Sequence, residues 1–121
     1  MRDFLLIFEG GDPDWAKNLS PEQMQGAMQE WGAWFEALEK SGNLRNPGAA
    51  LENAGAAVKA DGDRIVTDSL SSELKELVGG FSVICAESLD HATELAKGAP
   101  TLRHEPGTRV VIRPIFEMPN G

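Results

Sequence analysis

The chain has 121 residues, of which 41% are hydrophobic and 25% are charged. These proportions are typical of a folded globular protein and exclude the disordered class, which combines few apolar residues with high charge. At this length we expect one domain, spanning residues 1–121. Nineteen acidic against eleven basic residues give a net charge of -8, which disfavours direct binding to nucleic acid.

The single cysteine, Cys85, cannot form an internal disulfide, and it lies in an apolar run where a free thiol behaves as a small hydrophobic side chain. The apolar run of residues 4–8 is far shorter than the roughly 20 residues of a membrane span, and no small-residue cleavage site follows it. We therefore expect a cytoplasmic protein without an export signal or a membrane segment.

The N-terminal part of the chain predicts a strand and a long helix. Residues 4–8 form a continuous apolar run before Gly10-Gly11, which is typical of a strand buried on both faces and central in its sheet. The segment Ser20-Pro21-Glu22-Gln23 supplies an N-cap, a proline at the first helical position and a capping box, so a helix begins there. An apolar stripe follows at steps of three and four until Gly42 ends the helix. Its members are Met24, Met28, Trp31, Phe35 and Leu38.

The middle of the chain predicts two strands joined by a tight turn. Residues 49–59 are a weak strand candidate and residues 64–67 a second one, with Asp61-Gly62 as the hairpin turn between them. Ser71 or Ser72 then caps one short helical turn.

The C-terminal part predicts a strand, a helix and a last strand. Residues 80–86 form the first of these strands, and Ser88 caps a helix that Gly98 and Pro100 stop. Residues 108–116 form the last strand. Four side chains of the helix are expected to face inward: Leu89, Ala92, Leu95 and Ala96.

This order of elements predicts an α+β fold: a ferredoxin-like antiparallel sheet with one additional strand and two main helices on one face. Pro114 is tolerated only near a sheet edge or a strand end. Since residues 4–8 and 110–112 supply apolar side chains to both faces, the face without helices needs a partner. We expect a homodimer whose sheets pack together, with a cleft for a small molecule. A monomer with an amphipathic outer face is the alternative.

Several segments resemble the YCII-related proteins of the DGPF type, in which an Asp-Gly-Pro-Phe corner precedes Glu-x-Lys-Glu and then Gly-Gly-aromatic. Here Asp68 is followed by Ser69-Leu70-Ser71, after which Glu73-Leu74-Lys75-Glu76 and Gly79-Gly80-Phe81 follow the pattern. Four other stretches resemble the family in the same order, so that the resemblance covers nearly the whole chain. They are Phe4–Gly11, Met28–Trp34, Ala96–Pro100 and Val110–Ile115.

The resemblance implies an α+β barrel formed by two ferredoxin-like subunits. Most members of this type have no assigned reaction, some are associated with sigma factors, and a few distant relatives are dehydrochlorinases. Two further departures weaken an enzymatic role by analogy. Val111 stands where an acid is usual, and residues 20–28 lack the histidine proposed to pair with an aspartate in distant relatives.

Asp68, Glu73 and His104 are the candidates for proton transfer. The two carboxylates lie five residues apart around a corner, so a folded turn could bring them together as acid and base. Alternatively, Asp68 caps the turn and Glu73 stabilises a helix N-terminus. His104, in the loop before the last strand, is either a proton shuttle or an exposed loop residue.

Arg113 and Trp34 are the candidates for ligand binding. A guanidinium on a strand can hold a carboxylate of a ligand or pair with an acid at an interface. Trp34 lies one position off the apolar stripe and either lines an aromatic pocket or packs in the core or an interface. His91, in the first turn of a helix, is expected at the surface.

The sequence indicates neither a metal site nor a cofactor. The two histidines and one cysteine lack zinc-ligand spacing, the acids lack calcium-loop spacing, and neither Gly10-Gly11 nor Gly79-Gly80 continues as a phosphate loop.

The leading hypothesis is that a cytoplasmic homodimer binds a small organic molecule. The residues expected to line the cleft are Asp68, Glu73, Trp34, His104 and Arg113. One alternative is a cofactor-free acid–base enzyme, a lyase or isomerase of the dehydrochlorinase kind, with His104 or Asp68 moving protons. The other is a regulatory module associated with a sigma factor.

Overall fold

The structure is a computed structural model and describes residues 1–11, 15–52, 54–69 and 78–119. The strands are β1 (Arg2–Glu9), β2 (Leu44–Ala50), β3 (Ala56–Asp61), β4 (Arg64–Ser69), β5 (Val78–Ala86) and β6 (Arg109–Pro114). The helices are the 3₁₀ helix η1 (Trp15–Asn18), α1 (Pro21–Lys40), α3 (Leu89–Ala96) and the single turn α4 (Thr101–His104). The helical turn predicted after Ser71 or Ser72 lies outside the described residues.

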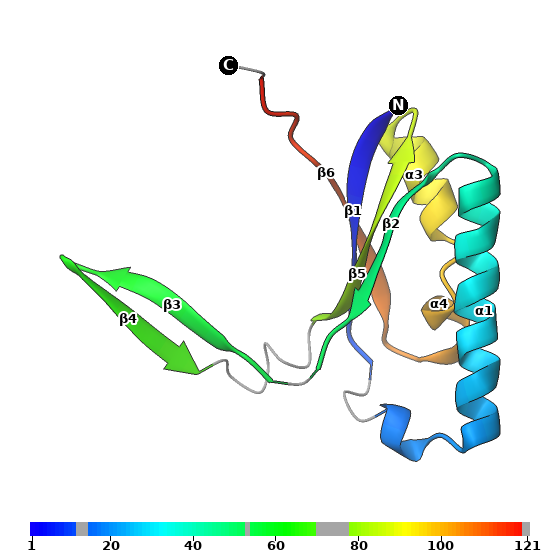
Figure 1. The fold of residues 1–121 in the computed structure, drawn as a ribbon, viewed down its shortest axis with the longest axis horizontal. Coiled ribbons are helices and arrows are strands. Elements are labelled where there is room, and N and C mark those ends of the chain that lie inside the picture. Colours follow the sequence, from blue (N-terminus) through cyan, green and yellow to red (C-terminus); the bar gives the residue numbers. More distant parts are fainter. Residues whose placement is uncertain (12–14, 53, 70–77, 120–121) are drawn as a thin grey trace.

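Four strands form one antiparallel sheet in the order β2-β5-β1-β6. This is the ferredoxin-like order. The strand β1 lies inside the sheet, which confirms the prediction that the apolar run of residues 4–8 forms a central strand. The helices α1 and α3 lie on one side of the sheet (Figure 1). Pro114 is the last residue of the edge strand β6, in keeping with its missing N–H.

The core lies between the sheet and the helices. Phe4 and Leu6 of β1 are buried on this side, against Leu38 of α1 and Ala92 and Ala96 of α3. Because side chains alternate along a strand, Leu5 and Ile7 point to the opposite side.

The start and the end of α1 are confirmed. The Ser20 Oγ atom accepts a hydrogen bond from the Gln23 amide at 3.1 Å, and Gln23 Oε1 accepts one from the Ser20 amide at 2.9 Å. Gly42 has a φ of 79°, the left-handed conformation expected of a residue that ends a helix.

The predicted stripe on α1 is wrong at Met28, which is 64% exposed. Trp34 and Leu38 are the buried residues of the helix. Met28 precedes Trp34 by six residues and is therefore rotated by about 120° from it around the helix axis. Trp34, one position off the predicted stripe, is part of the core, which was one of the alternatives for this residue.

The strand predicted over residues 49–59 is wrong, because this stretch contains the end of β2 and the beginning of β3. The structure therefore has two strands beyond the four-stranded sheet, β3 and β4, where we expected one. Their turn is at residues 62–63, since Asp61 still pairs with Arg64.

The strand β2 is irregular, because its register with β5 shifts on both sides of Asn46. Asn46 Oδ1 accepts a hydrogen bond from the Gly48 amide at 2.8 Å, and Ser82 Oγ donates one to the Pro47 carbonyl at 2.7 Å. Gly48 has a φ of 75°, and a Cβ atom there would lie 1.8 Å from the Phe81 carbonyl oxygen. Only glycine fits this bulge.

The helix α3 begins as predicted, with Ser88 Oγ accepting a hydrogen bond from the His91 amide at 3.1 Å. Its buried side chains are Ala92 and Ala96. Leu89, expected to face inward, is exposed at the first helical position. The turn α4 that follows was not predicted, since residues 101–104 have no apolar period.

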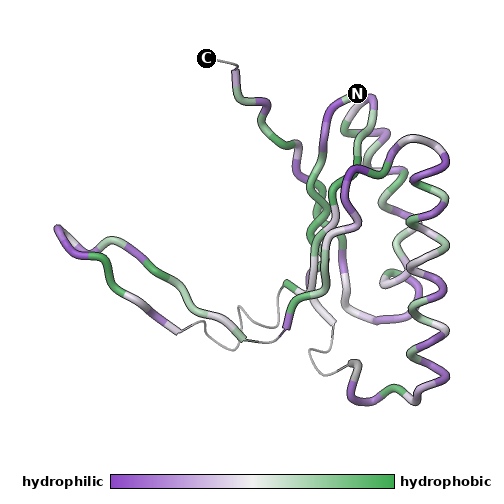
Figure 2. The backbone as a smooth tube through the Cα atoms, viewed as in Figure 1, coloured by the Kyte–Doolittle hydropathy of each residue, from purple (hydrophilic) through white to green (hydrophobic). Residues whose placement is uncertain are grey.

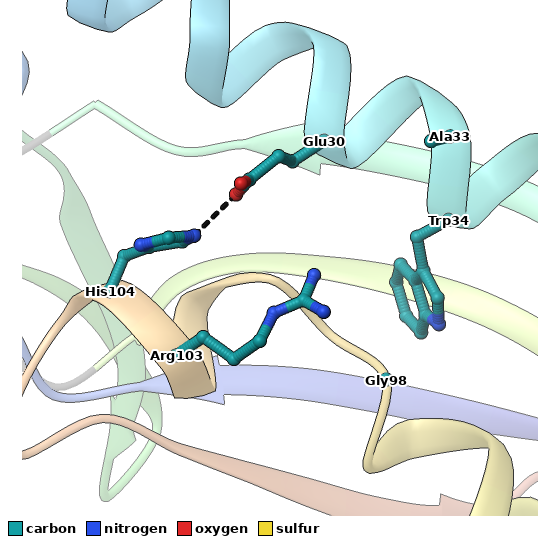
Figure 3. A pocket seen from close by; sticks show the side chains of 6 residues that line it. All are labelled: Glu30, Ala33, Trp34, Gly98, Arg103 and His104. Carbon is teal, nitrogen blue, oxygen red and sulfur yellow. Dashed lines mark ion pairs between the residues drawn. The ribbon is translucent and has the colours of Figure 1, made fainter.

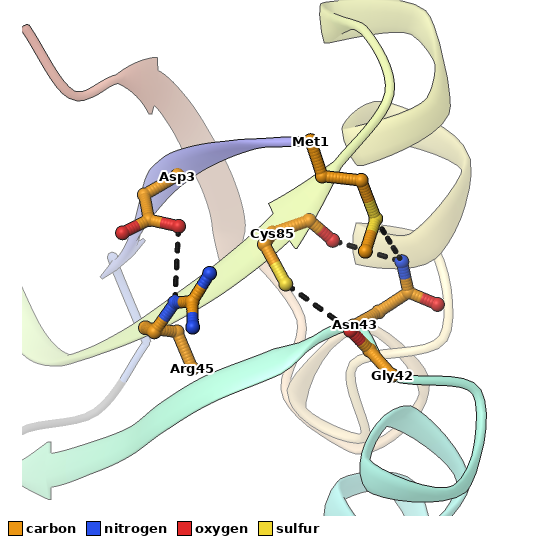
Figure 4. Close-up of polar contacts among 6 residues, drawn as sticks. All are labelled: Met1, Asp3, Gly42, Asn43, Arg45 and Cys85. Atoms are coloured by element: carbon orange, nitrogen blue, oxygen red, sulfur yellow. Dashed lines mark hydrogen bonds and ion pairs between the residues drawn. The ribbon is translucent and has the colours of Figure 1, made fainter. Parts of the chain in front are cut away.

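Polar side chains fasten the junction between α1 and β2 to the neighbouring strand (Figure 4). The buried Asn43 donates from Nδ2 to the Cys85 carbonyl at 2.8 Å, and Cys85 Sγ donates to the Gly42 carbonyl at 3.2 Å. Arg45 Nε lies 3.1 Å from Asp3 Oδ1, and this hydrogen bond together with the negative charge raises the pKa of Arg45. Cys85 is a buried free thiol, as its apolar surroundings predicted.

The hairpin of β3 and β4 projects away from the sheet, on the side opposite the helices (Figure 1). Apolar segments are visible along it in Figure 2. Val58 and Ile65 are among its exposed side chains. Within the described residues, no helix is both long and apolar enough to cross a membrane.

Candidate functional site

A groove open to solvent lies between α1 and the segment around α4 (Figure 3). It has a volume of about 610 Å³. Six residues line it: Glu30, Ala33 and Trp34 from α1, and Gly98, Arg103 and His104 from the opposite wall.

Tertiary contacts hold α4 in place, although it is only one turn long. Ala99 and Pro100, which precede it, are fully buried. On its other side, Thr108 Oγ1 lies 3.1 Å from the Thr101 carbonyl and 2.8 Å from the Glu105 carbonyl. The direction of Arg103 and His104 therefore depends on the packing of the loop around them.

His104 and Glu30 meet across the groove, with 2.5 Å between Nε2 and Oε2, and the contact is an ion pair when the imidazole is protonated. Both side chains remain partly exposed, at 56% for His104 and 42% for Glu30. A carboxylate bound to one ring nitrogen fixes the orientation of an imidazole, as in many acid–base sites. The pair thus places an exchangeable proton at the edge of the groove.

Trp34 lines the groove and belongs to a cluster of aromatic rings. Its ring centroid lies 5.7 Å from that of Trp31 and 5.3 Å from that of Phe35. Only 9% of its surface is exposed, so that a ligand would meet an edge of a firmly held indole. Gly98 lies against this ring, where a Cβ atom would come within 2.9 Å of the indole Nε1.

A comparison with protein families bears on this arrangement. The model of the YCII-related domain matches residues 5–119, nearly the whole chain. The chain belongs to the YCII-related domain family. No curated protein matches it. The YCII-related assignment accounts for the α+β fold, whereas the groove must be interpreted from its own residues.

The groove of this YCII-related protein brings together two of the predicted site residues, Trp34 and His104. Asp68 lies on β4, where Lys59 Nζ is 3.0 Å from its Oδ2 atom. Arg113 lies opposite Leu5 in the sheet and therefore points to the face without helices. Glu73 is outside the described residues. A joint role for these residues in one cleft stays a prediction.

Glu30 and Arg103 were not predicted. The spacing to Trp34 could have identified Glu30, because residues four positions apart lie next to each other on the surface of a helix. Arg103 had no such signal, since its position depends on α4. Within the described part of this YCII-related protein, no group of three or more His, Cys, Asp or Glu side chains could hold a metal ion.

We expect Gly98→Ala to lower the free energy of unfolding by about 1–3 kcal/mol, because the added methyl group overpacks the space beside the Trp34 indole. Urea denaturation followed by tryptophan fluorescence measures this change. The matched control is Gly32→Ala, within α1, where a Cβ atom meets nothing within 4 Å. The control should stabilise the protein by up to about 1 kcal/mol through helix propensity. Equal effects of both substitutions would contradict the tight contact at Gly98.

Proposed function

We propose that this protein, as a DGPF-type member of the family, binds a small organic molecule in the groove between α1 and α4. The observation that carries the proposal is the convergence of the Trp34 ring and the His104–Glu30 pair on one open groove. Small-molecule sites typically combine an apolar wall with a few polar groups that orient the ligand, in a volume of roughly 300–1,000 Å³. The groove has these properties.

The His104–Glu30 pair gives the site its chemistry. Imidazole gains and loses protons more readily near neutral pH than other side chains do. In the groove, a ligand group that reaches the pair can take up or release the proton between Nε2 and Oε2. Acid–base work without a cofactor is therefore the reaction class that this site supports best.

We further propose that the protein acts as a homodimer that buries the face of the sheet without helices. Strand pairing places apolar side chains in adjacent rows on this face. One row is Phe81, Ile7 and Val111, and the next begins with Val83 and Leu5. All five side chains are only half-buried in the single chain. A second copy of the same face would remove them from water, as a two-layer architecture requires.

A cytoplasmic location and the absence of direct nucleic-acid binding complete the proposal. The location is supported by the single buried thiol of Cys85, which suits a reducing compartment. The net charge of -8 opposes contact with phosphate backbones.

Nuclear magnetic resonance can test ligand binding, because the chain has two histidines whose imidazole signals can be told apart. We expect at least one of four one-ring compounds, benzoate, benzamide, phenol and benzylamine, to shift the His104 signal together with the backbone amides of residues 98–104. The His104→Gln variant identifies the signal by its disappearance. His91 is the matched control, since its Nδ1 accepts a hydrogen bond from the Glu87 amide at 3.1 Å, on α3 and away from the groove lining.

The proposal is wrong if none of the four compounds shifts these signals, or if the shifts map to other parts of the molecule. Either result would leave the groove without a ligand-binding role, and the His104–Glu30 pair would then only fasten α4 to α1.

A further inference from the structure

Most cationic side chains of the described residues have a partner within the chain. Ion pairs join Arg45 to Asp3, Arg109 to Glu9, Arg64 to Asp61, Lys40 to Glu36, Lys59 to Asp68 and Lys97 to Glu94. The Arg2 guanidinium lies 3.5 Å from the Ile115 carbonyl and over the Phe4 ring. Such pairing is expected in a chain with nineteen acidic and eleven basic residues.

The guanidinium groups of two arginines in the described ranges, Arg103 and Arg113, form neither a hydrogen bond nor an ion pair. Arg103 lines the groove next to Glu30, yet the Glu30 carboxylate is engaged by His104. His104 therefore competes with Arg103 for the Glu30 carboxylate. The guanidinium is left available at the wall of the groove, between the His104–Glu30 pair and the Trp34 ring in Figure 3.

Resting on the proposed function, we infer that Arg103 makes the groove selective for a planar molecule that carries a carboxylate. A guanidinium offers two parallel N–H donors that match the two oxygens of a carboxylate. A neutral amide ligand has only one acceptor oxygen and no negative charge, so it binds a guanidinium less tightly. Trp34 supplies an apolar edge for the planar part. In this arrangement Arg103 binds the acid group, Trp34 contacts the ring, and the His104–Glu30 pair faces the remaining substituents.

The comparison of benzoate with benzamide tests the inference, because the two compounds have nearly the same shape and differ in charge. In wild-type protein, we expect benzoate to bind the groove at least tenfold more tightly than benzamide, as measured by titration of the backbone amide signals of residues 98–104. The Arg103→Gln variant should lose this preference. Since Arg103 is exposed, the variant should keep the amide spectrum of the folded protein.

Arg64→Gln is the matched control, since it removes an exposed arginine of the β3–β4 hairpin, outside the groove lining. It should keep the preference for benzoate. Equal binding of benzoate and benzamide in wild-type protein, or a preference for benzoate that persists in Arg103→Gln, would overturn the inference while leaving ligand binding in the groove intact. Failure of all four one-ring compounds to bind there would overturn the proposed function as well.

Discussion

The substitution Gly48→Ala is expected to lower the free energy of unfolding by more than about 3 kcal/mol, beyond the range of most single changes. Two effects add. The φ of 75° is unfavourable for any residue with a Cβ atom, and that atom would lie 1.8 Å from the Phe81 carbonyl oxygen. This clash is with backbone, so no side chain can rotate to relieve it, and β2 must separate from β5. Urea denaturation and circular dichroism measure the loss.

Gly42→Ala is the control for Gly48→Ala. Its φ is 79°, but a Cβ atom there meets nothing within 4 Å. Only the conformational cost should appear, about 1–2 kcal/mol. The difference between the two variants isolates the contact with the Phe81 carbonyl. Similar losses in both would mean that β2 can shift to admit a methyl group, and the close approach of the two strands would be refuted.

The second large effect is expected from Ile7→Asp, which should convert the proposed homodimer into a monomer. Ile7 lies between Phe81 and Val111 in the apolar row of the sheet face without helices. A carboxylate at this position would be buried among the apolar side chains of the interface, which costs several kcal/mol. Sedimentation equilibrium at micromolar protein concentration measures the change, with circular dichroism to verify that the variant folds.

Met28→Asp is the control for Ile7→Asp. It places the same charge on an exposed position of α1, so the dimer should persist. Should Ile7→Asp fail to fold, Val83→Lys tests the same face through the neighbouring row. Wild-type protein that sediments as a single subunit at micromolar concentration would contradict the dimer.

Elements with strong local signals could be predicted from the sequence. The apolar run of β1 and the capping box of α1 specify their structures within a few residues, and both were found where expected. β2 has no such signal, because Leu44–Ala50 contains a proline and a glycine and no apolar alternation. Its place in the sheet comes from backbone hydrogen bonds to β5 and from the hydrogen bond that the Ser82 side chain of β5 donates to the Pro47 carbonyl. These partners lie far away in the sequence.

The candidate site was predictable only in part for the same reason. Trp34 stood out as an aromatic residue one position off the apolar stripe, and His104 as one of two histidines in the sequence. Their proximity to Glu30 and Arg103 could not be predicted, because the position of α4 depends on the burial of Ala99 and Pro100. Residues from two distant segments line one groove only after this turn has packed against the rest of the protein.

The projecting hairpin has a consequence for how the protein unfolds. Among the described residues, β3 and β4 pair only with each other, as a sheet of two strands. An isolated two-stranded sheet is only marginally stable in water. Its amide hydrogens should exchange with solvent through local opening, while those of β1 and β5 exchange only when the four-stranded sheet comes apart. We therefore expect the hairpin and the four-stranded sheet to open as separate cooperative units, and a second subunit that contacts the hairpin would slow exchange in the hairpin first.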